Sequence, residues 1–256
     1  MSSNDVTIPT PSLTSLLYVK SAKYSAATQH PFLTAAGDGS LANDQLSYWL
    51  AQDRIYASHA YPRFIGQLIA KIPFSSAHAA SSPEQQRNDR ILRVLSFCLQ
   101  NIVREVAFFS DTSEKFGLEI GIRNQVGDAG WPERKATMDY TAEMARIAAL
   151  GTLGEGLVFL WAMERVYLDA WKHVASARMG TASTEPLSSL SLATAVDGFV
   201  TNWTSAEFEA FVRDLADLVD LCDVPLEAAS VVWNRVLELE EAFWPEEGEA
   251  LAVKSQ

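Results

Sequence analysis

The chain has 256 residues, a length that one domain can reach, and its 48% hydrophobic and 20% charged residues are ordinary for a protein with a sizeable core. A formal net charge of -12 repels phosphate backbones and argues against a nucleic-acid partner. No apolar run approaches the roughly 18 residues that span a bilayer, the N-terminus lacks a secretory pattern, and Cys98 and Cys222 lie in separate apolar segments. These features argue against a membrane protein and a disulfide framework, and they predict a cytoplasmic location.

Helical periodicity dominates the N-terminal half, where no convincing alternating strand occurs. The apolar spacing predicts helices at about residues 10–27, 43–64 and 83–116. Gly37-Asp38-Gly39 predicts a turn before the second helix, and Pro62 should kink that helix.

The C-terminal half predicts five more helices, at about residues 133–150, 153–175, 190–202, 204–221 and 225–244. Thr204 followed by Glu207 predicts a capping box. The expected domain is residues 10–245, with a flexible insertion at 176–188, between a flexible N-terminus (1–9) and a flexible acidic tail (246–256). The predicted fold is therefore all-α, a single-domain bundle of about eight helices.

Three carboxylates interrupt apolar helical stripes, where carboxylates are normally avoided. Asp53 lies in the middle of the stripe of the second helix, with Tyr56 one turn later. Glu164 interrupts the stripe that contains Leu157, Leu160, Trp161, Leu168 and Trp171, with Tyr167 close by. Glu240 shares a face with the apolar residues Ala229, Val232, Trp233, Val236 and Phe243, whereas Glu238 and Glu241 should point to solvent.

An unpaired ionised carboxylate costs several kcal/mol to bury, so three of them suggest a shared polar pocket in which raised pKa values suit acid–base chemistry. The alternative is that they form structural ion pairs with arginines such as Arg54, Arg63, Arg165 or Arg235.

Other kinds of site lack their sequence patterns. The histidines do not have metal-site spacing, and the paired Glu-x-x-His pattern of a di-iron bundle is absent. Neither a phosphate-binding glycine loop nor a Gly-x-Ser-x-Gly elbow occurs. Cys98 lies between Phe97 and Leu99 and is interpreted as a core residue, and the tryptophans are core residues by default.

Three motifs near the N-terminus occur in a specific order: His30-Pro31-Phe32, then Gly37 to Leu41 (GDGSL), then Tyr48 to Asp53 (YWLAQD) with Tyr56. This order resembles the N-terminal signature of the TenA (thiaminase II) family. The segment from Val236 to Trp244 resembles the family's closing helix, in which a glutamate precedes a Phe-Trp pair by three residues. The resemblance extends from about Leu13 to Trp244 and implies the haem-oxygenase-like helical fold.

The resemblance implies a hydrolase that salvages the thiamin pyrimidine by replacing an exocyclic amine with a hydroxyl. Asp53 would bind a ring nitrogen and the 4-amino group, and Glu240 would act as general acid or base on the leaving amine. Tyr56 and Tyr140, together with Tyr167 and Phe243, would line the pocket, and Trp203 falls where the family has a stacking aromatic.

One position departs from the cysteine-type members of this family. Their nucleophilic cysteine lies on the fifth helix, where this chain has Ala162-Met163-Glu164-Arg165. This stretch looks like the glutamate-type branch (TenA_E), which is linked to the aminopyrimidine and its N-formyl precursor, and it places thiaminase activity in doubt. We expect Glu164 and Glu240 to divide the acid and base roles, with no metal or organic cofactor needed.

Two other functions remain open from the sequence: a different enzyme on the same bundle, and a non-catalytic pyrimidine-binding or regulatory protein. Binding alone would need only Asp53 and the aromatic residues, whereas the complete set with Glu164 and Glu240 favours an enzyme. The resemblance also implies a homodimer or homotetramer.

Overall fold

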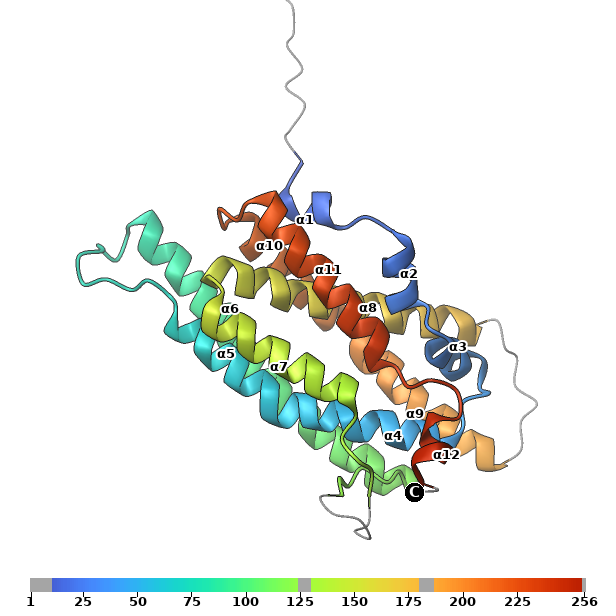
Figure 1. Cartoon of the computed structure of the whole chain (residues 1–256). Coiled ribbons are helices and arrows are strands. Elements are labelled where there is room, and N and C mark those ends of the chain that lie inside the picture. The colour runs from blue at the N-terminus through green and yellow to red at the C-terminus, as the bar shows by residue number, and fades with distance from the viewer. Residues whose placement is uncertain (1–10, 124–129, 180–186, 255–256) are drawn as a thin grey trace, which may run out of the picture.

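The computed structural model describes residues 11–123, 130–179 and 187–254, and this part of the chain is helical, with one isolated bridge between Ile122 and Trp131 in place of any strand. The all-α prediction is confirmed (Figure 1). In chain order the helices are α1 (Leu13–Leu17), α2 (Ala22–Thr28), α3 (Pro31–Asp38), α4 (Asn43–Ile55), a π-helical turn (Tyr56–Ala60), α5 (Tyr61–Ala70), α6 (Pro83–Phe116), α7 (Lys135–Leu150), α8 (Leu153–Met179), α9 (Leu187–Trp203), α10 (Ala206–Asp220), α11 (Leu226–Phe243) and α12 (Glu249–Lys254). None of these helices is long and apolar enough to cross a membrane.

Helix α8 is the centre of the bundle. Its residues 156–163 are all buried, because α2, α3, α9, α10 and α11 pack around it, and a helix that is apolar on every side is buried on every side. Gly156 permits the contact with α5, since a Cβ at this position would lie 2.3 Å from Leu68 Cδ2. On the side of the bundle seen in Figure 1, α7 runs beside both α5 and α11.

The first predicted helix is two helices, because the chain leaves the helical path after Leu17 and Ser21 caps a new helix by accepting a hydrogen bond from Tyr24 N. The segment before Gly39 is also helical. His30 Nδ1 accepts from Phe32 N at the start of α3, and Gly39 ends this helix with φ 84°. At α10 the cap is Ser205, not Thr204, whose hydroxyl donates to Val200 O instead.

The second predicted helix widens into a π turn just before Pro62. Tyr61 N–H donates to Tyr56 O, five residues back, and Pro62 has no N–H with which to continue the α-helical ladder to Ser58. The expected kink is therefore a π turn at Tyr56–Ala60, and such turns occur often at functional sites.

The acidic tail predicted to be flexible contains α12, which packs against α4. Glu249 on α12 forms a two-pronged ion pair with the buried Arg134, at 2.7 Å and 2.8 Å. Arg134 Nη1 also donates to Phe243 O at the end of α11, over 2.6 Å. The tail prediction is therefore corrected for residues 249–254. Residues 1–9 of the predicted N-terminus and 180–186 of the predicted insertion lie outside the described residues.

Candidate active site

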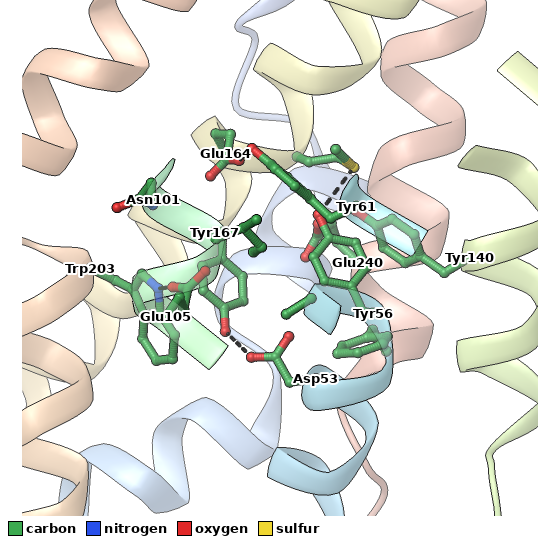
Figure 2. A pocket seen from close by; sticks show the side chains of 14 residues that line it. Asp53, Tyr56, Tyr61, Asn101, Glu105, Tyr140, Glu164, Tyr167, Trp203 and Glu240 are labelled. Atoms are coloured by element: carbon green, nitrogen blue, oxygen red, sulfur yellow. Dashed lines mark hydrogen bonds between the residues drawn. The ribbon is translucent and has the colours of Figure 1, made fainter. Parts of the chain in front are cut away.

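One pocket brings together every site residue predicted from the sequence (Figure 2). The predicted residues that line it are Asp53, Tyr56, Tyr140, Glu164, Tyr167, Trp203, Glu240 and Phe243. The space between the lining atoms, part of it open to solvent, is about 540 Å³.

Helical spacing explains why these side chains converge. Residues three or four apart lie on one face of a helix. Glu164 and Tyr167 have this spacing on α8, and so do Asp53 near the end of α4 and Tyr56 at the start of the π turn that continues it. Glu240 and Phe243 repeat this spacing at the end of α11. Tyr140 from α7 and Trp203 from α9 complete the predicted set.

Each of the three predicted carboxylates accepts a hydrogen bond from a tyrosine hydroxyl. Tyr167 donates to Asp53 Oδ2 over 2.9 Å. Tyr61 donates to Glu164 Oε1 over 2.6 Å, and Tyr140 donates to Glu240 Oε1 over 2.5 Å. Asp53 and Glu240 are 5% and 4% exposed, and Glu164 is half-buried.

The arginines proposed as structural partners bind elsewhere. Arg165 forms an ion pair with Asp169, and Arg235 with Glu238, while Arg54 donates to the carbonyl of Ile120. Arg63 is exposed. No lysine or arginine lines the pocket, and none of the described ion pairs involves Asp53, Glu164 or Glu240.

Burial raises the pKa of all three carboxyls. Removal from water raises the pKa of Asp53, Glu164 and Glu240 to about 8 each. Repulsion among the pocket carboxylates adds to this, whereas the tyrosine hydroxyls partly offset it by stabilising the ionised forms. Because the groups interact, they titrate together, and at neutral pH most of them hold protons.

A model of the TENA/THI-4/PQQC family matches residues 20–249, which is most of the chain. The chain belongs to this family. Its fold also resembles solved structures of TenA homologues. It superimposes on a TenA homologue from Pyrococcus furiosus with a TM-score of 0.66 and 21% identity, covering 87% of this chain and 92% of that one. A putative TenA-like thiaminase from Sulfolobus solfataricus P2 gives 0.64 and 16% identity, with 94% of each chain covered.

A sequence relative in Fusarium pseudograminearum is described as a probable transcription factor. The two are 30% identical over an alignment of 219 positions that covers 76% of this chain, and the chain spans only 42% of that protein's length. The shared region is therefore less than half of that protein.

The pocket of this TenA-family chain contains no thiol. Met163 lines it, and the hydroxyl of Tyr56 lies 3.5 Å from Met163 Sδ. Cys98 is fully buried behind Tyr61 and is not part of the lining, and Cys222 lies beyond the end of α10. The core assignment of Cys98 is confirmed.

Sequence reasoning missed three polar lining residues: Tyr61, Asn101 and Glu105. Glu105 follows Cys98 and Ile102 on the inner face of α6, so the rule that singled out the other carboxylates could also have found it. Trp203 Nε1 donates to the carboxylate of Glu105, and burial raises the pKa of Glu105 to about 7. Tyr61 comes directly after the π turn, which an α-helical pattern cannot foresee.

Four carboxylates and four tyrosines give the pocket hydrogen-bond acceptors, proton donors and latent negative charge. This combination can bind a basic, donor-rich small molecule and move protons at it. Among the described residues, no group of three or more His, Cys, Asp and Glu side chains is arranged to hold a metal ion.

Proposed function

We propose that this TenA-family protein is a C–N hydrolase acting on 4-amino-5-aminomethyl-2-methylpyrimidine or its N-formyl derivative, in salvage of the thiamin pyrimidine. The observation that supports it best is a pocket lined by four carboxylates and by no lysine, arginine or cysteine. Such a lining suits a basic amine, and it leaves proton transfer and water activation to acids.

Asp53 is suited to the edge of an aminopyrimidine because its raised pKa keeps it protonated at neutral pH. A neutral carboxyl offers one O–H donor and one carbonyl acceptor. A ring nitrogen and the adjacent 4-amino group offer the matching acceptor and donor. The hydrogen bond from Tyr167 fixes the carboxyl for this contact.

Glu164 and Glu240 divide the proton transfers of the hydrolysis. One of them, ionised, removes a proton from a water that attacks the exocyclic carbon. The other takes up the extra proton of the bound ammonium and returns it to the departing nitrogen as the C–N bond breaks, so that the nitrogen leaves as ammonia. The products are the hydroxymethylpyrimidine and ammonia. Repulsion between Glu164 and Glu240 favours this division of roles, because it disfavours the state in which both glutamates are ionised. With the N-formyl derivative the same pair would hydrolyse the amide and release formate.

The test is incubation of the purified protein with the aminopyrimidine, its N-formyl derivative and thiamin, with release of ammonia, formate or thiazole followed in each case. We expect turnover of one or both of the first two and little or none of thiamin. The proposal is wrong if none is hydrolysed. Tight binding of the pyrimidine without hydrolysis would instead favour a non-catalytic pyrimidine-binding protein.

A further inference from the structure

Glu105 on α6 lines the pocket but has no part in the reaction proposed above. Two donors from the end of α9 reach its carboxylate, Trp203 Nε1 and Asn202 Nδ2, the latter over 3.4 Å. Both of these bonds are made to the same oxygen, Oε1, so they leave Oε2 available to a ligand.

Glu105 lies at the opposite end of the pocket from Glu240. Figure 2 shows Glu105, Trp203 and Asn101 on one side of Tyr167, with Glu240 and Tyr140 on the other. The charge of Glu105 raises the pKa of Asp53 and Glu164, which lie between these two ends.

The nearest basic side chain is already engaged outside the pocket. Arg104 Nη1 pairs with the exposed Glu207 over 3.2 Å, and its Nη2 donates to Asn101 Oδ1 over 2.6 Å. Asn101 thus has its amide oxygen occupied, which leaves its N–H groups as donors at the pocket. The charge of Arg104 lowers the pKa of Glu105 from outside the pocket, but no lysine or arginine lines this end, so a cationic ligand is the one partner of opposite charge that can reach Oε2 from within the pocket.

We infer that Glu105 is a specificity-determining residue that favours a ligand bearing a protonated amine over a neutral ligand of the same shape. A hydrogen bond between two charged groups is stronger than one to a neutral hydroxyl. The rings of Tyr167 and Trp203, whose centroids are 5.0 Å apart, give a cation at this end aromatic neighbours as well. This inference rests on the proposed function in two respects: the pocket takes the pyrimidine, and the proton donor to its amine is Glu164, which lies between Glu105 and Glu240 (Figure 2).

The test uses two ligands of nearly equal shape, 4-amino-5-aminomethyl-2-methylpyrimidine, which is cationic at neutral pH, and its neutral 5-hydroxymethyl analogue. Their dissociation constants are measured by calorimetry in Glu240→Gln protein, so that turnover does not consume the amine, and again after adding Glu105→Gln. Glutamine keeps an oxygen to accept the Trp203 N–H. Glu207→Gln is the matched control, since it removes a carboxylate on the other side of Arg104, outside this pocket.

We expect Glu105→Gln to lower the preference for the amine by about tenfold or more, with little change for the hydroxymethyl compound, and Glu207→Gln to leave the preference unchanged. Equal weakening of both ligands would overturn the inference, because Glu105 would then only anchor Trp203. An unchanged preference, or no binding of either ligand, would also overturn it. A preference lost with Glu105→Gln in a protein whose wild type hydrolyses nothing would support this inference and refute only the proposed hydrolysis.

Discussion

Two regions of the described chain withdraw carboxylates from water fully or in part, and they neutralise these groups in opposite ways. In the pocket, Asp53 and Glu240 receive hydrogen bonds from tyrosines, and burial raises the pKa of each to about 8. Next to α4, Glu249 meets Arg134. Burial alone would raise the pKa of Glu249, but the bonds and the charge of Arg134 outweigh it and lower the pKa.

The difference separates a structural carboxylate from one that is available for chemistry. Arg134 and Glu249 satisfy each other, and together they connect α7, α11 and α12. Even Arg165, the residue next to Glu164 on α8, pairs with Asp169 and leaves Glu164 to Tyr61. A buried carboxyl without a counter-ion is costly to ionise, so it holds its proton and stays available to a ligand and to proton transfer.

The comparison is tested most strongly by removing one pocket acid. Glu240→Gln and Glu164→Gln should each lower turnover of the pyrimidine substrate by about 10²–10⁴-fold, because each removes a proton donor or acceptor. Circular dichroism and thermal melting should show that both variants fold. Glu241→Gln is the control, since Glu241 is exposed and follows Glu240 directly. Full activity in both pocket variants would refute the paired-acid mechanism.

In the region of the Arg134–Glu249 pair, we expect a substitution to lower stability and not activity. Arg134→Met leaves Glu249 without its counter-ion and should lower the free energy of unfolding by about 3–5 kcal/mol in denaturant titrations. The exposed pair of Arg235 and Glu238 provides the matched control, and Arg235→Met should cost at most about 1 kcal/mol. If the two variants cost the same, the Arg134 pair is not the structural link described here.

The free energy of unfolding should depend on pH with opposite signs in the two regions. Asp53, Glu164 and Glu240 keep their protons up to a pH of about 8 when folded, whereas an unfolded carboxyl loses its proton near pH 4. Each proton held only in the folded state makes stability fall by about 1.4 kcal/mol per pH unit as the pH rises between these values. Glu249, with its lowered pKa, acts oppositely and loses its contribution as the pH falls through the acidic range.

Denaturant titrations from pH 5 to pH 9 measure this slope. We expect a decrease across the range, and a shallower decrease in an Asp53→Asn, Glu240→Gln variant. A stability that is flat or rises with pH would show that the pocket carboxyls ionise normally in the folded protein.

The smallest expected effect concerns the bond from Tyr61 to Glu164. Tyr61→Phe removes a donor that stabilises the ionised carboxylate, so the pKa of Glu164 should rise further. Loss of this bond also leaves the Glu164 side chain less firmly positioned, so at neutral pH the rate should fall by about fivefold, which corresponds to about 1 kcal/mol. The limb of the pH–rate profile that reports Glu164 should move to higher pH. Tyr24→Phe, which removes a similar bond to Asp169, should leave the profile unchanged. A profile unmoved by Tyr61→Phe would mean that Glu164 does not control the rate.

The sequence predicted a helix correctly where residues at the two ends of the helix mark its start and its stop. The prediction of a helix over residues 83–116 matches α6 because Ser82 caps its start and Gly117, with φ 65°, ends it. The predicted pocket residues converge because each acid lies in an apolar stripe, and the stripes of packed helices face a common interior.

What the sequence could not provide depends on distant partners or on irregular backbone. Helix α12 has six residues and docks through an arginine more than a hundred positions earlier, so its own composition reads as a solvated tail. Tyr61 reaches Glu164 from just past a π turn, which α-helical periodicity does not describe. Glu105 also follows an apolar stripe and could have been predicted in the same way, but α6 is long and carries many other charged residues, among which Glu105 does not stand out.

The docking of Glu249 on Arg134 also has a genetic consequence. A stop codon or frameshift anywhere between codons 245 and 249 would remove Glu249 and leave a buried arginine without its partner at the end of the helix that bears Glu240. Such an allele should behave like a mutation in the core and not like the loss of a tail.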